Sequence, residues 1–170
     1  MKEILFVDGY NIINAWFKLN SPYDYELETA RIKLLEILSQ YQAVKDIKII
    51  VVFDAYKVKG GREFRDKVDG IDVVFTKEGE TADNFIERCI ASYKDEFRVR
   101  VATSDWMEQQ IIFAQGAERI TPRELKNEIV EMFNTIEKYR ENTFKRKQPL
   151  ELRLSTKVKE ALEEWRKKHD

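Results

Sequence analysis

Cysteine, histidine, glycine and proline are all scarce in this 170-residue chain. The one cysteine, Cys89, has no partner for a disulfide within the chain, and the one histidine, His169, is the penultimate residue. This scarcity argues against zinc sites and against catalysis by serine–histidine or cysteine–histidine pairs. With 6 glycines and 3 prolines, the chain also lacks the composition of collagen or of low-complexity disorder.

Long apolar runs are absent as well. No stretch approaches the roughly 18 apolar residues that a membrane-spanning helix needs, and Asp8 interrupts the first apolar run too early for a signal peptide. We therefore expect a cytoplasmic protein with no membrane partner. Hydrophobic residues make up 43% of the chain and aromatic residues 12% of the chain, which is enough for the core of a single domain.

The charge is almost balanced over the whole chain but unevenly distributed. The net charge is −1, whereas residues 140–170 hold ten Lys or Arg and six Asp or Glu, so this stretch carries +4 and the rest −5. A second basic group lies in a glycine-containing segment without clear periodicity, which predicts a long polar loop. Its members are Lys57, Lys59, Arg62, Arg65 and Lys67.

Apolar, β-rich runs alternate with helical patterns along the first 140 residues. We expect strands at 4–7, 47–53, 71–75, 97–102 and 117–120, and helices at 23–43, 85–93 and around 107–112. Such alternation implies parallel pairing with right-handed crossovers. The expected fold is a three-layer, Rossmann-like α/β sandwich with a mainly parallel sheet of four to five strands flanked by helices.

The remaining elements follow the last expected strand. Thr121-Pro122-Arg123-Glu124 combines a capping box with proline at the first helical position, and predicts the start of a long helix. After the polar stretch 141–148, the apolar positions predict a terminal amphipathic helix, which we expect to pack on the same domain. These positions are Val158, Ala161, Leu162 and Trp165.

Aspartates follow four separate strands. Asp8 ends the first strand, Asp54 ends the second, Asp83 lies between the third strand and its helix, and Asp105 follows the fourth. Each has an alternative explanation as a turn residue, a first-turn helix acid or an N-cap. Four like charges at one sheet edge, however, repel one another unless a cation holds them. The cluster therefore predicts a site for Mg²⁺ or Mn²⁺, which prefer oxygen ligands.

Other polar and aromatic residues accompany these acids. Asn11 follows Asp8 by three residues, and serves either a metal-bound water or phosphate or simply a helix start. Thr81 and Ser104 stand beside Asp83 and Asp105, where hydroxyls cap helices or contact phosphate oxygens. Trp106 either packs within its helix or stacks on a base.

The chain resembles a known family at these positions. The motifs Val7-Asp8-Gly9-Tyr10-Asn11-Ile12-Ile13, Phe53-Asp54-Ala55, Glu80-Thr81-Ala82-Asp83-Asn84 and Thr103-Ser104-Asp105 resemble the NYN branch of the PIN-like nucleases, in particular the bacterial YacP-like family. The resemblance covers residues 3–140 and implies an NYN domain at 1–140 with a basic extension at 141–170. It further implies a PIN-like fold and a metal-dependent endoribonuclease that acts on mRNA in association with the ribosome. The residues at its motif positions are Asp8, Asn11, Asp83 and Asp105.

The residues themselves suit phosphodiester hydrolysis. Without a usable histidine, a metal must activate water and neutralise the phosphate. In this interpretation Asp8 and Asp105 hold one ion, Asp83 orients the water directly or through a second ion, and Asp54 completes the pocket. Two basic segments would bind the flanking RNA backbone without specifying sequence, namely the group at 57–67 and the run Lys145, Arg146 and Lys147.

Three alternative classes of protein place different demands on this sequence. A phosphoacceptor receiver domain needs a lysine after its last strand, where this chain has Arg119-Ile120-Thr121. Dinucleotide binding needs a glycine-rich turn after the first strand, where this chain has Gly9-Tyr10-Asn11-Ile12. A non-catalytic RNA- or ribosome-binding module that keeps the metal site stays open, and a cleavage assay with and without metal separates it from an enzyme.

Overall fold

The strands form one mixed sheet that is mostly parallel. The computed structural model describes residues 2–17, 24–55, 61–147, 160, 161 and 163–167. Its elements are β1 (Lys2–Asp8), α1 (Gly9–Trp16), α2 (Asp24–Lys45), β2 (Lys48–Phe53), β3 (Phe64–Val68), β4 (Ile71–Phe75), α3 (Ala82–Tyr93), β5 (Phe97–Ala102), α4 (Trp106–Ala114), β6 (Glu118–Ile120) and α5 (Pro122–Lys147). The strand order is β3-β4-β2-β1-β5-β6, and every neighbouring pair is parallel except β3 with β4.

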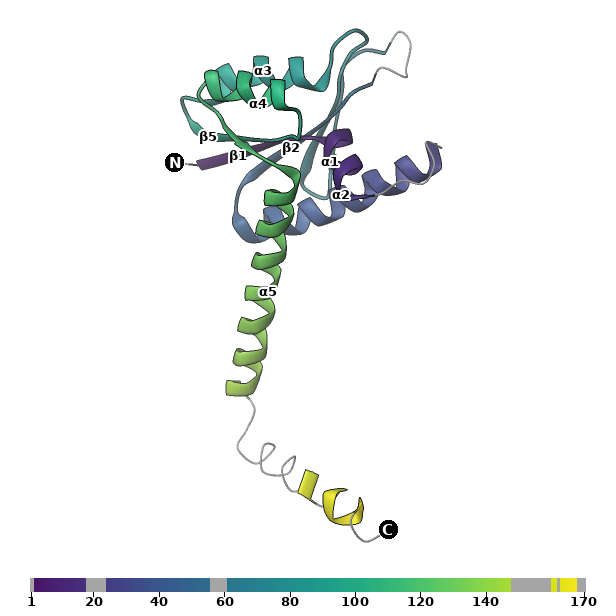
Figure 1. The fold of residues 1–170 in the computed structure, drawn as a ribbon, viewed down its shortest axis with the longest axis vertical. Coiled ribbons are helices and arrows are strands. Elements are labelled where there is room, and N and C mark those ends of the chain that lie inside the picture. Colours follow the sequence, from purple (N-terminus) through teal and green to yellow (C-terminus); the bar gives the residue numbers. More distant parts are fainter. Residues whose placement is uncertain (1, 18–23, 56–60, 148–159, 162, 168–170) are drawn as a thin grey trace. The chain divides into compact units, whose positions relative to one another are not determined.

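Helices cover both faces of this sheet, with α3 and α4 on one side and α1 and α2 on the other (Figure 1). Along β1, Ile4 and Phe6 belong to the buried cluster that includes Phe85 of α3 and Ile112 of α4. The alternate residue Leu5 is equally buried and points to the opposite face. A strand buried on both faces reads as a continuous apolar run, and the predicted α/β sandwich is confirmed.

The segment expected as a long polar loop contains a strand, so that expectation was wrong for residues 64–67. Phe64 lies opposite Phe75 and Val68 opposite Ile71 in an antiparallel pair. The turn between them holds Asp69 and Gly70 at positive φ of 49° and 85°. Asp-Gly between two strands is a hairpin signal. The strand escaped detection because β3 is an edge strand, whose exposed positions carry no apolar pattern. Lys57 and Lys59 lie outside the described residues.

Helix α5 begins at the predicted capping box. The Thr121 hydroxyl accepts a hydrogen bond from the Glu124 backbone at 3.1 Å, and the Glu124 carboxylate accepts one from the Thr121 backbone at 3.3 Å. The helix continues to Lys147, through the polar residues that were expected to interrupt it, because charged residues such as Lys, Arg and Glu are good helix formers. Residues 160, 161 and 163–167 are helical, whereas Val158 and Leu162 lie outside the described residues.

The chain divides into two units, Met1–Ile129 and Val130–Asp170. The first unit contains a buried ionic network around Arg100 of β5, which is 8% exposed. Its guanidinium contacts a Glu3 oxygen at 3.0 Å and a Glu128 oxygen at 2.7 Å, and Glu128 also accepts a hydrogen bond from the Tyr41 hydroxyl at 3.1 Å. The network therefore ties β1, β5, α2 and the start of α5 together. Among the described residues, no helix has the combined length and apolarity that a bilayer crossing requires.

Candidate metal centre

The acids predicted at the strand ends lie along the carboxyl edge of the sheet. Asp8 is the last residue of β1, Asp54 follows β2, Asp83 lies in the first turn of α3 and Asp105 precedes α4. Strand β1 is central, and the chain winds outward from it first through β2 and β4, then through β5 and β6. The reversal between β1 and β5 is the topological switch point where such sheets bind ligands.

Three carboxylates meet there. Asp8, Asp83 and Glu108 each offer an oxygen, and these oxygens lie within 4.8 Å of one another. Oxygens bound to one Mg²⁺ at about 2.1 Å would be roughly 3–4 Å apart, so a small contraction brings all three onto one ion. Asp8 and Asp83 are half-buried, and Glu108 is 2% exposed. The site is therefore a partly enclosed acidic cluster.

The carboxyl groups of Asp8 and Glu108 lose their protons at higher pH than ordinary carboxyl groups do. Burial, the Asp83 charge and a hydrogen bond with Asp83 raise the pKa of Asp8 from 3.8 to about 7, with a small further rise from Asp54, and the Asn11 backbone amide opposes them. Burial and a hydrogen bond with Asp83 raise the pKa of Glu108 to about 9, although the Thr103 hydroxyl works in the opposite direction. Such acids must share protons or bind a cation.

Glu108 gives the clearest indication of a cation. Its Oε2 accepts a hydrogen bond from the Thr103 hydroxyl at 2.8 Å. Its Oε1 is buried and has no hydrogen-bond partner in the described part of the chain; the Asp83 carboxylate can serve as one only when one of the two acids is protonated. An unsatisfied buried carboxylate oxygen is costly. Asp8, Asp83 and Glu108 each offer a carboxylate oxygen, and the Glu108 oxygen has no other partner in the described residues. These donors fit Mg²⁺ or Mn²⁺, which the three acids would hold.

Sequence reasoning did not include Glu108 in the site. Asp105 does cap α4, since its Oδ1 accepts hydrogen bonds from the backbone of Met107 at 2.9 Å and of Glu108 at 3.2 Å. The Glu108 carboxylate does not accept a hydrogen bond from the Asp105 backbone amide, which donates to the Thr103 hydroxyl, and it points into the protein instead. Within the described residues, neither Asp105 nor Asp54 belongs to the three-carboxylate cluster. Their roles as direct ligands stay predictions.

Asn11 and the neighbouring hydroxyl residues hold the loops that carry the acids. The Asn11 Oδ1 accepts a hydrogen bond from the Ser104 backbone at 2.7 Å, which fastens the loop between β5 and α4 to α1. The Thr81 hydroxyl accepts one from the Asn84 backbone at 3.1 Å, so its capping role is confirmed. Contacts of Asn11, Thr81 and Ser104 with phosphate stay predictions.

Gly9 explains why glycine follows the first aspartate. A Cβ at this position would lie 2.4 Å from the Phe53 ring, which is buried between Tyr10 and Phe75. Only glycine lets α1 begin so close to β2. The Tyr10 hydroxyl in turn accepts a hydrogen bond from Arg31 at 3.0 Å, which links α1 to α2. This packing fixes the chain direction immediately after Asp8.

The predicted RNA-binding cations differ in their surroundings. Arg65 pairs with Glu63 at 3.1 Å, and Arg88 bridges Glu63 and Glu80 at 2.8 Å each. The charge of Arg65 is therefore partly balanced locally. Arg62 and Lys67 are exposed, as are Lys145 and Arg146 near the end of α5, where Lys147 is the last helical residue.

The fold and the site together define an α/β protein of the nuclease-like class, with an acidic cluster at the carboxyl ends of its parallel strands. The chain belongs to the YacP-like NYN domain family, whose family model matches residues 5–167. It is 39% identical over 166 residues to "Uncharacterized protein YacP" of Bacillus subtilis, covering 97% of each chain.

Solved structures agree with this assignment. The crystal structure of Rae1 (YacP) from Bacillus subtilis matches with a TM-score of 0.68 and 38% identity, covering 97% of this chain and 95% of that one. A point variant of the same protein matches with a TM-score of 0.70 and 36% identity, covering 90% and 89%. The resemblance expected from the motifs is confirmed over nearly the whole chain.

Proposed function

We propose that this chain is a divalent-metal-dependent endoribonuclease that hydrolyses phosphodiester bonds of RNA, with ribosome-associated mRNA as its substrate. The observation that carries the proposal is the buried Glu108 oxygen without a hydrogen-bond partner beside Asp8 and Asp83. Membership of a nuclease-like family supports RNA as the substrate. The mRNA and ribosome parts rest on the family resemblance alone.

The proposal gives each acidic residue a task. Asp8, Asp83 and Glu108 hold Mg²⁺ or Mn²⁺, and Asp54 adds negative charge close to Asp8. When bound, such an ion supplies positive charge for the phosphate and makes a water molecule more acidic. Asp105 orients Glu108 by capping α4, because the capped turn contains the Glu108 backbone amide. A direct contact between Asp105 and the ion would add to this positioning task.

Asn11 has a positioning task on the other side of the switch point. By accepting the Ser104 amide it holds the Asp105 loop near Asp8. We assign its Nδ2 to a phosphate oxygen or a water molecule. Thr81 and Ser104 offer further hydroxyls to phosphate at the same edge.

Basic residues outside the pocket would hold the flanking RNA backbone. The acidic cluster repels RNA, so local positive charge has to outweigh it. We assign this role to Lys57, Lys59, Arg62, Arg65 and Lys67 and to the run Lys145, Arg146 and Lys147. Because Arg65 is paired with Glu63, it should contribute less than Arg62.

The test is cleavage of end-labelled RNA with Mg²⁺ or Mn²⁺, with EDTA as the metal-free control. Glu108→Gln and Asp8→Asn should abolish cleavage and reduce Mn²⁺-induced thermal stabilisation, while Asp95→Asn, in an exposed turn after α3, should change neither. A protein silent on naked RNA is assayed next on translating ribosomes. Stabilisation by Mn²⁺ without cleavage in either assay would favour the non-catalytic RNA- or ribosome-binding module.

A further inference from the structure

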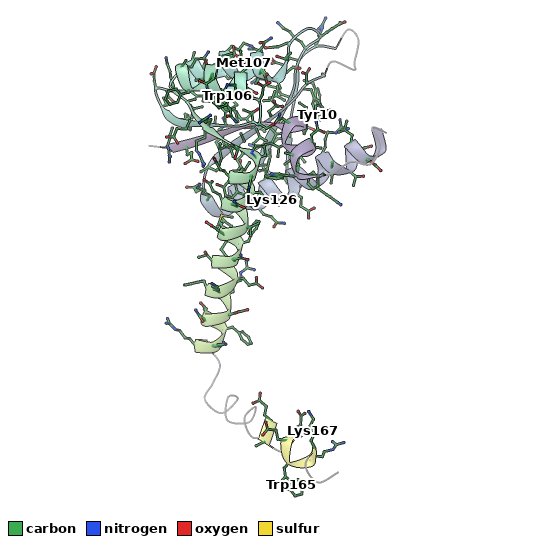
Figure 2. All side chains as sticks on the ribbon, in the orientation of Figure 1. Tyr10, Trp106, Met107, Lys126, Trp165 and Lys167 are labelled. Atoms are coloured by element: carbon green, nitrogen blue, oxygen red, sulfur yellow. The ribbon has the colours of Figure 1, made fainter. Side chains whose placement is uncertain are left out.

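Trp106 is the first residue of α4 and one of the most exposed large side chains in the described part of the chain. It is 63% exposed, whereas Glu108, Gln109 and Ile112 on the inner side of the same helix are buried. Figure 2 shows Trp106 on α4 next to Met107. Packing into the core is therefore not its role. Together with Met107, which is 69% exposed, Trp106 offers apolar surface at the start of α4 that a ligand can cover.

The indole ring has a defined neighbour. The Arg119 guanidinium lies 5.6 Å from the ring centroid of Trp106. Arg119 also donates a hydrogen bond to Gln109 Oε1 at 3.0 Å, and Gln109 Nε2 donates one to the Thr103 carbonyl at 2.7 Å. The Thr103 hydroxyl in turn binds Glu108. A cation–π contact and a series of hydrogen bonds through Gln109 and Thr103 thus connect the exposed ring to the Glu108 carboxylate.

This arrangement reduces the entropic cost of binding on the ring. A side chain that is already held in place loses less freedom when a ligand covers it. Gln109, at 5% exposure, is buried and gives Arg119 a fixed anchor. Because Arg119 covers only part of a ring that stays 63% exposed, aromatic surface is left for a second planar group.

Trp106 belongs to the helix turn that also carries one acid of the cluster. It follows the helix cap Asp105 directly and precedes Glu108 by two residues. In a helix, residues two apart have Cα atoms about 5 Å apart but point to roughly opposite sides, so Trp106 lies on the outer side of the turn whose inner side carries Glu108. We therefore assign the indole to the base of a nucleotide that flanks the one at the cluster.

The charge of the site favours a nucleobase as the occupant. The proposed ion and the basic segments offset the repulsion between the three carboxylates and the phosphates, and a contact to a base adds affinity that does not depend on charge. Stacking on an aromatic ring provides such a contact for any base, and a neighbouring arginine strengthens it. We propose that Trp106, supported by Arg119, is the stacking platform for a base of the RNA strand beside the metal centre. The inference rests on the proposed function in taking RNA as the ligand.

The experiment measures binding to two single-stranded oligomers with equal numbers of phosphates, oligoadenylate and a fully abasic ribose-phosphate oligomer. Ca²⁺ replaces Mg²⁺, and binding is followed by the fluorescence anisotropy of end-labelled oligomers, so that the signal does not depend on Trp106. Trp106→Ala should weaken oligoadenylate binding by roughly 5- to 150-fold, the range for losing one stacked base. Trp106→Phe should keep most of the affinity, and Arg119→Met should lose part of it.

Two controls define the result. Affinity for the abasic oligomer should be the same for Trp106→Ala and the parent, and Phe113→Ala, elsewhere on the exposed side of α4, should bind like the parent. An unchanged Mn²⁺-induced rise in melting temperature shows that Trp106→Ala folds with its metal site intact. Equal losses for both oligomers, unchanged oligoadenylate affinity, or no base-dependent binding by the parent would each overturn the proposal.

The outcomes also separate this inference from the proposed function. Base-dependent binding through Trp106 without any RNA cleavage would refute the nuclease and leave the platform in place. RNA cleavage combined with RNA binding that does not depend on Trp106 would support the nuclease and refute the stacking platform. If Trp106→Ala affects only ribosome binding, α4 is a protein-docking surface, and the stacking role is wrong.

Discussion

Replacing Asp83 by asparagine should make the metal-free protein more stable. Asp83 is the acid that raises the pKa of both other members of the cluster, since it faces Asp8 and Glu108 alike. Asparagine removes the shared negative charge, and its amide can donate hydrogen bonds to the two remaining carboxylates. The substitution keeps nearly the same shape, so packing around α3 should be preserved.

The size of the effect follows from two opposing contributions. Burial is the largest cause of both pKa shifts, and the Asp83 charge adds to each. Removing a like charge at this range is worth on the order of 1 kcal/mol at each of the two neighbours. Against this, Asp83 is in the first turn of α3, where losing a negative charge costs about 0.3–1 kcal/mol. The net gain at pH 8 is about 1–2 kcal/mol. For a chain of this length that is roughly 2–8 °C in melting temperature.

The gain should depend on pH in a defined direction. The folded protein holds the Asp8 and Glu108 protons more tightly than the unfolded chain, so these groups favour folding at low pH. This contribution is lost as pH rises through about 7 for Asp8 and about 9 for Glu108. In EDTA, the parent should therefore lose stability between pH 6 and pH 9, and Asp83→Asn should lose less.

Thermal melts in EDTA and in Mn²⁺ across this pH range make the measurement. Mn²⁺ should stabilise the parent, by an amount set by its concentration relative to Kd, and should stabilise Asp83→Asn much less. Asp95→Asn makes the same charge change at an exposed turn and should behave like the parent. A variant that is less stable than the parent in EDTA at pH 8, or that responds fully to Mn²⁺, would refute the assignment of Asp83 to a shared cation site.

Three further predictions concern packing, the ionic network and RNA binding. Gly9→Ala should cost about 1–3 kcal/mol in urea unfolding, because its Cβ would overlap the buried Phe53 ring; parental stability would show that the ring can move aside. Glu128→Gln should lower the free energy of unfolding by about 1–3 kcal/mol, because Arg100 loses its charged partner on α5 and keeps only Glu3 on β1. An unchanged urea midpoint would contradict this. Neutralising Lys59, Arg62 and Arg65 together should weaken RNA binding and flatten the plot of log affinity against log salt concentration, by roughly one unit of slope per lost phosphate contact. An unaltered slope would shift the assignment to residues 145–147.

The sequence predicted the parallel part of the fold because buried parallel strands carry a strong signal. Runs such as Ile49 to Phe53 are apolar without interruption, and the Thr121 capping box marks a helix start unambiguously. Edge strand β3 has no such signal, since its exposed positions alternate charge with no buried face. Only the Asp69-Gly70 turn could have revealed it. The length of α5 was underestimated because polarity alone does not end a helix.

The candidate site was predictable to the extent that it depends on strand ends. Asp8 and Asp83 follow strands directly, and topology brings them to one edge. Glu108 was missed because an acid three residues after an N-cap aspartate is also the capping-box pattern. The distinguishing signal was its place four residues before Ile112, on the buried face of α4, where a charged side chain needs a partner. Whether Asp54 or Asp105 touches the ion is not encoded in such spacing.

The two outer strands of the sheet also bear on how the protein behaves at high concentration. An outer strand offers backbone N–H and C=O groups that can recruit a strand from another molecule and start aggregation. Here β6 has 3 residues, and β3 carries Arg65, Asp66 and Lys67 at exposed positions. Short length at one edge and alternating charge at the other both oppose such recruitment. The charged residues that make β3 hard to predict from sequence thus also oppose edge-to-edge pairing between molecules.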